Sequence, residues 1–189
     1  MPRLFIALPI EPDVKKNLAG INEFLSDHRQ SLKITGPENY HLTVKFLGAC
    51  ADDLAGKIEN SFSGIDYPRN EIPFTARGIG VFPNLKMPAV IWAGLRMSGE
   101  TLNRLYLQIE DFASALGFEK EKREFSPHLT LARVRKEKKV SDELKNYIIN
   151  NKETPLGESS FKRLVLYSSN LTPEGPVYTE VKSVAFTSR

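Results

Sequence analysis

The stretch His41-Leu42-Thr43-Val44 returns 87 residues later as His128-Leu129-Thr130-Leu131, and these two copies contain two of the three histidines in the chain. Successive side chains of an extended strand point to opposite faces. Each copy, read as a strand, therefore places its histidine and threonine on one face and two apolar residues on the other. Two such strands predict one site that is built from two halves.

This combination of side chains suits chemistry at a phosphodiester. Histidine has an unperturbed pKa of about 6.5, so one imidazole can accept a proton while the other donates one. The two hydroxyls of Thr43 and Thr130 can hold a charged group between them. For either copy alone, the simpler interpretation is a strand tripeptide with a partly buried histidine.

The surroundings of the motif are repeated as well, in pattern rather than in identity. Each unit is predicted to contain strand, helix, motif strand, shorter helix and strand, so the chain is a β-α-β-α-β unit written twice. The first unit is predicted at residues 3–8, 11–27, 40–47 and 52–62, with a strand from Phe74; the second is predicted at 89–95, 99–116, 127–134 and 141–150, with a strand from Phe161.

Amphipathic spacing supports the longer helices. Apolar residues recur at steps of three and four in the second unit, at Leu102, Leu105, Ile109, Phe112, Ala113 and Leu116. Gly117 follows them, as expected of a residue just beyond a helix end. In the first unit Val14, Leu18, Ile21 and Leu25 form the matching stripe. Both stripes are predicted to be core.

Length and composition fit a protein with a substantial core. The chain has 189 residues and 41% apolar content, enough for one large domain or two small lobes. No apolar stretch approaches the ~20 residues of a membrane span, and the N-terminus enters a strand at once, which predicts a cytoplasmic protein. Cys50 is the only cysteine, so an internal disulfide and a thiolate metal cluster are excluded.

Positive charge is concentrated after the second motif. A basic run there contains Arg133, Arg135, Lys136, Lys138 and Lys139, although the net charge of the whole chain is only +3. It is either a solvated loop or a contact for a phosphate-rich partner.

Three other side chains have expected positions. Strict alternation puts Lys45 on the face of His41, as a phosphate-side cation or a solvated strand end, and Phe46 on the core side with Leu42. His28, at the end of the first helix, is expected at the surface.

The extended blocks around the motifs resemble a known family. They are Arg3-Leu4-Phe5-Ile6-Ala7-Leu8, Pro37-Glu38-Asn39-Tyr40-His41-Leu42-Thr43-Val44-Lys45-Phe46-Leu47-Gly48, Gly80-Val81-Phe82-Pro83, Trp92-Ala93-Gly94-Leu95 and Phe125-Ser126-Pro127-His128-Leu129-Thr130-Leu131-Ala132-Arg133. They look like the bacterial and archaeal RNA 2′,3′-cyclic phosphodiesterases. This is the ThpR or LigT branch, historically called 2′-5′ RNA ligase, of the 2H phosphoesterase superfamily.

The resemblance implies a bilobal α+β fold in which two antiparallel sheets face each other across a central cleft, with helices outside. Residues 1–189 are expected to form a single domain of two pseudo-symmetric lobes, about 1–85 and 86–170, followed by a C-terminal strand at about 176–187.

The resemblance also implies an activity: hydrolysis of an RNA 2′,3′-cyclic phosphate to a 2′-phosphate without metal or cofactor, with a weak ATP-independent 2′-5′ joining of RNA ends. It implies that His41 is the proton donor and His128 the proton acceptor. Thr43 and Thr130 would hydrogen-bond the phosphoryl oxygens, and Arg133 would neutralise their charge. Arg133 lies five residues after His128, so alternation alone would turn it away from the cleft unless the strand ends or bulges near Ala132.

Other classes of protein fit less well. Neither motif histidine has an Asp, Glu or Cys within two residues, and no P-loop occurs. A small cyclic nucleotide or a 2′-5′ oligonucleotide as substrate, or a non-catalytic RNA-binding module, stays open. Lys45, Arg135, Lys136, Lys138 and Lys139 are candidate RNA contacts. No obligate protein partner, no membrane and a monomeric state are expected.

Overall fold

The computed structural model describes residues 1–172 and 175–186. Its strands form an antiparallel sheet in the order β7-β4-β5-β6-β3-β1-β8-β9, with β2 paired to β6. The strands are β1 (Arg3–Pro9), β2 (Leu32–Ile34), β3 (His41–Ala49), β4 (Ile72–Phe82), β5 (Val90–Arg96), β6 (His128–Val134), β7 (Pro155–Phe161), β8 (Arg163–Leu171) and β9 (Pro176–Ala185). The last position of the strand expected at 176–187 lies outside the described residues.

The order of the strands is symmetric about its centre. The motif strands β3 and β6 are neighbours, β1 and β5 flank them, and β8 and β4 come next. The third strand of each sequence unit therefore crosses over: β4 pairs with β5, and β8 pairs with β1. The boundary near residue 85 separates the two sequence units. It does not separate the two halves of the sheet, because each half contains strands from both units.

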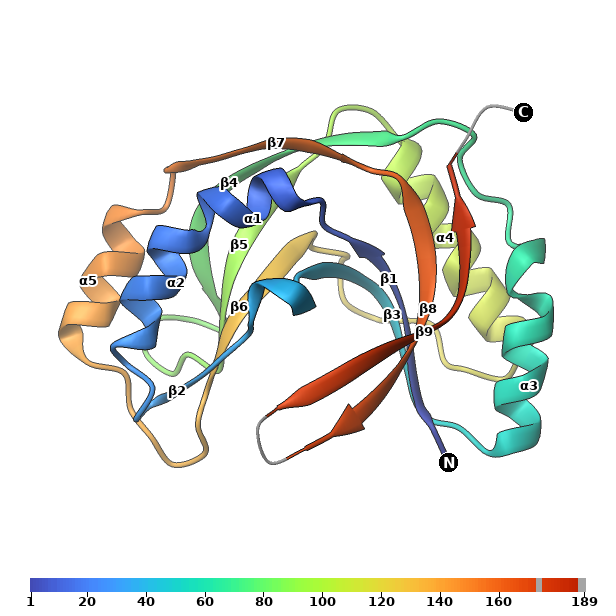
Figure 1. Cartoon of the computed structure of the whole chain (residues 1–189), viewed down its shortest axis with the longest axis horizontal. Coiled ribbons are helices and arrows are strands. Elements are labelled where there is room, and N and C mark those ends of the chain that lie inside the picture. The colour runs from blue at the N-terminus through green and yellow to red at the C-terminus, as the bar shows by residue number, and fades with distance from the viewer. Residues whose placement is uncertain (173–174, 187–189) are drawn as a thin grey trace.

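The two halves of the sheet meet through a short contact. β3 and β6 pair at Leu42 and Leu129. The expected α+β fold with antiparallel sheets around a central cleft is confirmed, and this pair joins the two sheets into one curled sheet (Figure 1).

Helices cover the outer side of the sheet. They are α1 (Pro12–Asn17), α2 (Ala19–Ser26), α3 (Asp52–Ser61), α4 (Thr101–Ala115) and α5 (Asp142–Asn150), with short 3₁₀ turns η1 (Pro37–Asn39) and η2 (Phe62–Gly64). In Figure 1, α2 and α5 lie on the left of the curled sheet and α3 and α4 on its right. Among the described residues, no helix is long and apolar enough to cross a membrane.

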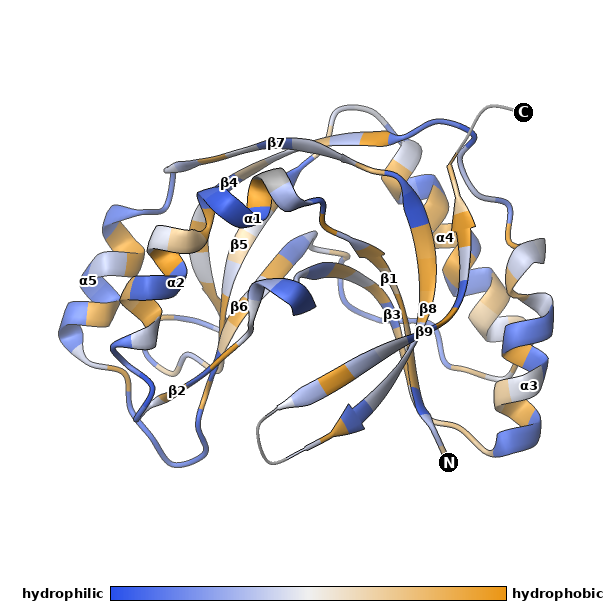
Figure 2. Cartoon of the chain, viewed as in Figure 1, coloured by the Kyte–Doolittle hydropathy of each residue, from blue (hydrophilic) through white to orange (hydrophobic). Residues whose placement is uncertain are grey.

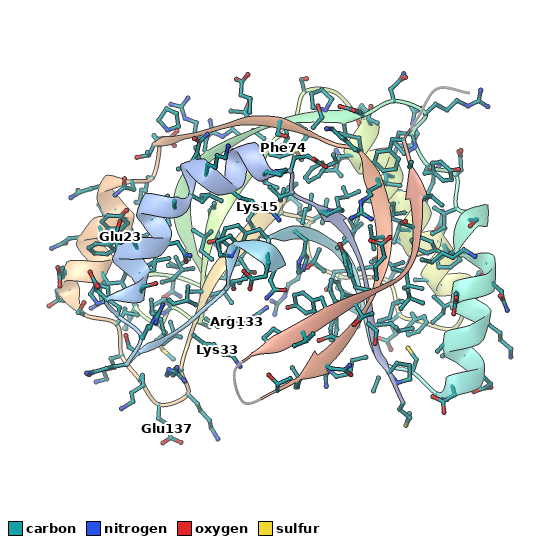
Figure 3. All side chains as sticks on the ribbon, viewed as in Figure 1. Lys15, Glu23, Lys33, Phe74, Arg133 and Glu137 are labelled. Atoms are coloured by element: carbon teal, nitrogen blue, oxygen red, sulfur yellow. The ribbon has the colours of Figure 1, made fainter. Side chains whose placement is uncertain are left out.

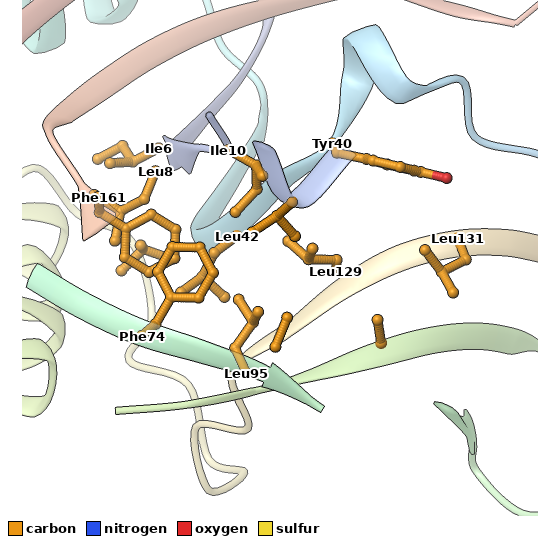
Figure 4. Close-up of a cluster of buried hydrophobic side chains, with 14 of the residues drawn as sticks. Ile6, Leu8, Ile10, Tyr40, Leu42, Phe74, Leu95, Leu129, Leu131 and Phe161 are labelled. Atoms are coloured by element: carbon orange, nitrogen blue, oxygen red, sulfur yellow. The ribbon is translucent and has the colours of Figure 1, made fainter. Parts of the chain in front are cut away.

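The core lies between the helices and the sheet. Most residues of the predicted stripes are buried, with Leu105 and Ile109 of α4 and Leu18 and Leu25 of the first unit at 1% exposure or less. Phe112 and Leu116 are partly buried and pack against this core. Figure 4 shows Leu42 and Leu129 side by side in this core. Orange apolar residues run along the strands and the sheet-facing sides of the helices (Figure 2). Gly117 has a φ of 92°, as a residue beyond the end of α4 requires.

Two predicted elements differ from the structure, and two strands were not predicted. The helix expected at 11–27 is divided at Leu18 into α1 and α2. A strand was expected to begin at Phe161, but Phe161 is the last residue of β7, and the next strand, β8, begins at Arg163. Neither β2 nor β7 was predicted, because β2 has three residues and β7 contains Pro, Gly, Glu and two Ser, which are weak strand formers.

Candidate active site

The four motif side chains come together where the two halves of the sheet meet. Leu42 and Leu129 are opposite each other in an antiparallel pair. Continuing that register by one residue places His41 opposite Thr130 and Thr43 opposite His128. These four side chains are partly accessible, whereas both leucines are fully buried. Each histidine thus neighbours the threonine of the other motif.

The two imidazoles are oriented in the same way. Nδ1 of His41 lies 2.7 Å from the carbonyl oxygen of Asn39, and Nδ1 of His128 lies 2.7 Å from that of Ser126. A carbonyl only accepts hydrogen bonds, so in each ring Nδ1 carries the proton that it donates. The Nε2 atoms are left for chemistry, and each histidine lies two residues beyond the residue that orients its ring.

Both histidines favour the neutral form in the free protein. Burial lowers the pKa of His41 to about 4, helped by the charges of Arg133 and His128 and opposed by the hydrogen bond to Asn39. Burial also lowers the pKa of His128, again with help from Arg133. The two rings lie on the same face of neighbouring strands, which pair at Leu42 and Leu129.

Aromatic rings account for much of this burial. The ring of His41 lies 5.0 Å from that of Phe5, 5.2 Å from that of Tyr178 and 6.2 Å from that of Tyr167, measured between centroids. His128 has Phe82 at 5.0 Å and Trp92 at 6.5 Å. Sequence reasoning missed Tyr167 and Tyr178, which reach the site from β8 and β9 and belong to neither motif.

A β-bulge turns Arg133 into the cleft. Ile91 pairs with Ala132, but Trp92 pairs with Thr130, so Leu131 is an extra residue in β6. A bulge of this kind reverses the alternation beyond it. Arg133 is therefore exposed on the face of Thr130 and lines the same cavity. The bulge required for Arg133 to reach the cleft is present.

The first motif strand has a matching bulge, which corrects two sequence-based interpretations. Ile6 pairs with Lys45 but Ala7 with Thr43, so Val44 is the extra residue. Phe46, expected in the core, is 56% exposed and lines the cavity. Lys45, expected on the face of His41, is 7% exposed and points into the interior. Strict alternation failed here because two consecutive residues face the core.

Lys45 forms a buried ion pair instead of a phosphate contact. Its Nζ lies 2.8 and 2.9 Å from the two carboxylate oxygens of Glu110 on α4 and donates to the carbonyl of Glu119 at 2.8 Å. Glu110 also accepts a hydrogen bond of 2.8 Å from the backbone N–H of Glu121. The pair therefore ties β3 to the segment that leads into the second motif.

The cavity next to the motifs has a volume of about 760 Å³ and is open to solvent. Its lining combines hydroxyls, cations, apolar side chains and the carboxylate of Glu38. These include Arg3, Phe5, Lys33, Asn39, His41, Thr43, Phe46, Thr130, Arg133, Leu171, Val177 and Tyr178. His128 flanks this cavity without lining it. The β8–β9 hairpin forms one wall, because Leu171, Val177 and Tyr178 lie in its two strands.

The cations of the basic run after Arg133 differ in whether they bind to the rest of the fold. The guanidinium of Arg135 is bound to the fold, because its Nε lies 3.0 Å from the carbonyl oxygen of Arg29 and 3.1 Å from that of Leu32. Lys136, Lys138 and Lys139 are exposed. They lie in the loop of Glu137 below the cleft in Figure 3. Of the four candidate RNA contacts in this loop, these three have free cations.

Two residues outside the motifs are structural. His28, expected at the surface, is only partly exposed, and its ring lies 5.0 Å from that of Phe24. Tyr40 is 2% exposed, on the opposite side of the strand from His41. Among the described residues, no three His, Cys, Asp or Glu side chains are arranged to hold a metal ion.

The open cavity is surrounded by two imidazoles with free Nε2 atoms, two hydroxyls and one guanidinium. This set of groups is typical of a phosphoesterase active site. The sequence model of the family described as LigT like Phosphoesterase matches residues 8–92 and again 95–178. The chain belongs to this LigT-like phosphoesterase family.

Similar proteins cover almost the whole chain. A protein of Methanocaldococcus jannaschii named RNA 2′,3′-cyclic phosphodiesterase is 36% identical over 183 residues, which are 95% of this chain and 98% of that protein. A protein of Archaeoglobus fulgidus with the same name is 33% identical over 181 residues, again 95% of this chain and 98% of that protein.

Solved structures have the same fold. A crystal structure of a Thermus thermophilus protein has a TM-score of 0.80 at 26% identity and covers 97% of both chains. E. coli LigT in complex with 3′-AMP has a TM-score of 0.72 at 21% identity and covers 98% of both chains.

Proposed function

We propose that this protein hydrolyses RNA 2′,3′-cyclic phosphate ends to 2′-phosphates by paired histidine acid–base catalysis. The observation that carries the proposal is the pair of Nδ1–carbonyl hydrogen bonds of 2.7 Å, which leave both Nε2 atoms for proton transfer. The names of the related proteins support the choice of substrate.

The proposed reaction is one displacement at phosphorus. His128 accepts a proton from water as the water oxygen bonds to phosphorus, and His41 donates a proton to O3′ as the bond between phosphorus and O3′ breaks. Thr43, Thr130 and Arg133 hold the phosphoryl oxygens and their charge. The anionic phosphate raises the pKa of His41, which burial otherwise lowers to about 4, so substrate binding supplies the protonated donor.

Phe46 is proposed as the platform for the terminal base. Its ring is 56% exposed at a cavity wall, so much of its surface makes no packing contact. A base stacked on an aromatic ring gains about 1–3 kcal/mol. The guanidinium of Arg3 lies 5.7 Å from the centroid of the Phe46 ring and holds it from one side.

Two other reactions would use the same site. Weak 2′-5′ joining would be the reverse type of transfer, with an RNA hydroxyl in place of water. Action on a small cyclic nucleotide would use the same catalytic residues. Action as a monomer in the cytoplasm stays a prediction.

The test is an assay with a short RNA that ends in a 2′,3′-cyclic phosphate, run with EDTA and then with added Mg²⁺ or Mn²⁺. We expect a 2′-phosphate product and an unchanged rate in EDTA. Loss of activity in EDTA with recovery on adding a divalent ion would point to a metal-bound hydroxide instead. RNA binding without turnover would favour a non-catalytic binding module.

A further inference from the structure

Lys33 and Arg133 form a pair of neighbouring cations in the cleft. They are directly opposite each other on β2 and β6, in the register that also pairs Leu32 with Val134. Residues opposite each other in an antiparallel pair have Cα atoms about 4.5–5.5 Å apart. Both side chains line the cavity, and Figure 3 shows them close together beside the β8–β9 hairpin.

Like charges directly opposite on two strands destabilise a sheet. Within residues 1–172 and 175–186, no carboxylate lies within ion-pair distance of Lys33 or Arg133. Other cations around the cleft have partners: Arg3 lies over Phe46, and Arg135 donates to two carbonyls. The carboxylate of Glu38 lines the same cavity, but it accepts a hydrogen bond from Asn39 and forms no ion pair with either cation. Two neighbouring cations without ion-pair partners at a cavity wall are suited to bind more than one negative charge.

The two cations also differ in what they can bind. Arg133 follows Thr130 on motif strand β6, faces the same side and lines the cavity with His41 and Thr43, so it is assigned to the reacting phosphate. Lys33 is on β2, which pairs with β6 at Ala132–Val134, beyond the motif residues His128 and Thr130. The position of Lys33 is therefore next to the reacting phosphate rather than at it.

We propose that Lys33 forms a second phosphate subsite, which binds the phosphodiester on the 5′ side of the terminal nucleotide. This inference rests on the proposed function and defines its substrate class as an oligonucleotide end rather than a free nucleoside cyclic phosphate. β2 occurs in the first unit only, so the subsite extends the cleft in one direction. RNA leaving along Lys33 then passes toward the loop that carries Lys136 and Lys138.

The test compares two substrates that differ by one phosphate: a nucleoside 2′,3′-cyclic phosphate and a dinucleotide with the same cyclic end. In the Lys33→Gln variant we expect the ratio of kcat/KM for the dinucleotide to kcat/KM for the nucleoside to fall about tenfold or more, because one charge-assisted hydrogen bond is lost. The slope of log KM against log salt for the dinucleotide should decrease by about 0.7. Lys33→Arg should retain most of the wild-type ratio.

Two control variants complete the experiment. Lys57→Gln removes an exposed lysine on α3, at the outer side of the fold, and should leave the ratio unchanged. Arg133→Gln should lower kcat/KM for both substrates and leave the ratio near its wild-type value. A Lys33→Gln ratio equal to that of wild type would overturn the subsite. Wild-type protein inactive on both substrates would instead overturn the proposed function.

Discussion

Phe46 and Arg133 occupy equivalent positions, each five residues after its histidine and each turned into the cleft by a bulge that directly follows the threonine. The two motif strands accordingly begin with the same order of partly accessible and buried positions. At the last position of this pattern, β3 has the aromatic ring of Phe46 and β6 has the guanidinium of Arg133. A symmetric frame thus presents an apolar surface on one side of the reacting group and a positive charge on the other.

This asymmetry makes a prediction for Phe46. Phe46→Ala should raise KM for a nucleotide substrate about tenfold or more with a smaller change in kcat, because stacking acts on the base and not on the reacting phosphate. Phe46→Tyr keeps the ring and should retain a KM near wild type. Steady-state kinetics of both variants provide the check, and a drop in kcat with unchanged KM would assign the ring to catalysis instead.

The histidines are predicted to act as one unit. His41→Ala and His128→Ala should each lower kcat by ~10²–10⁴, the usual contribution of a positioned acid or base. The double variant should lose far less than the product of the two losses, because both residues serve one displacement. Circular dichroism of each variant controls for folding. A single variant that keeps more than a third of the wild-type rate would contradict the assignment.

The sequence was sufficient to place the motif residues and insufficient to place the strand residues beyond them. Alternation over three residues put His41 and Thr43 on one face, because no irregularity occurs within so short a span. After the threonines, the bulges at Val44 and Leu131 reverse which side of the strand each following side chain faces. No residue type near either bulge predicts it. In β3 the result is opposite to the usual preference, because Lys45 is buried and Phe46 is exposed. Tyr178 was missed for a different reason, since its contact with His41 depends on the β8–β9 hairpin, which is distant in the sequence, returning to β1.

The pH dependence should shift with Arg133. In the free protein both histidine pKa values lie below 6.5, with His41 at about 4. One imidazole must be protonated and the other neutral, so kcat/KM should follow a bell whose maximum lies below pH 6.5. The guanidinium of Arg133 lowers both pKa values, so Arg133→Gln should move the maximum to higher pH. Rates measured from pH 4 to 9 provide the check, and a shift to lower pH would contradict the electrostatic role.

The buried pair of Lys45 and Glu110 should matter for stability. Lys45→Met leaves a buried carboxylate without its partner and should lower the free energy of unfolding by about 3–5 kcal/mol. The double variant Lys45→Met with Glu110→Leu removes both charges and should recover much of that loss. Urea titrations of the single and double variants measure the difference. Equal destabilisation by both would mean that the unpaired carboxylate is not the cause of the loss.

The exposed lysines after the second motif are predicted to guide RNA. Changing Lys136, Lys138 and Lys139 to Gln should raise KM for a long oligonucleotide and flatten its salt dependence, because fewer counterions are released on binding. A nucleoside 2′,3′-cyclic phosphate has no further phosphates to contact, so its KM serves as the internal comparison. Arg135 is tested separately, because its hydrogen bonds to Arg29 and Leu32 predict a loss of stability when it is replaced. If the triple variant affects both substrates equally, the loop supports the fold or the site rather than the path of the RNA.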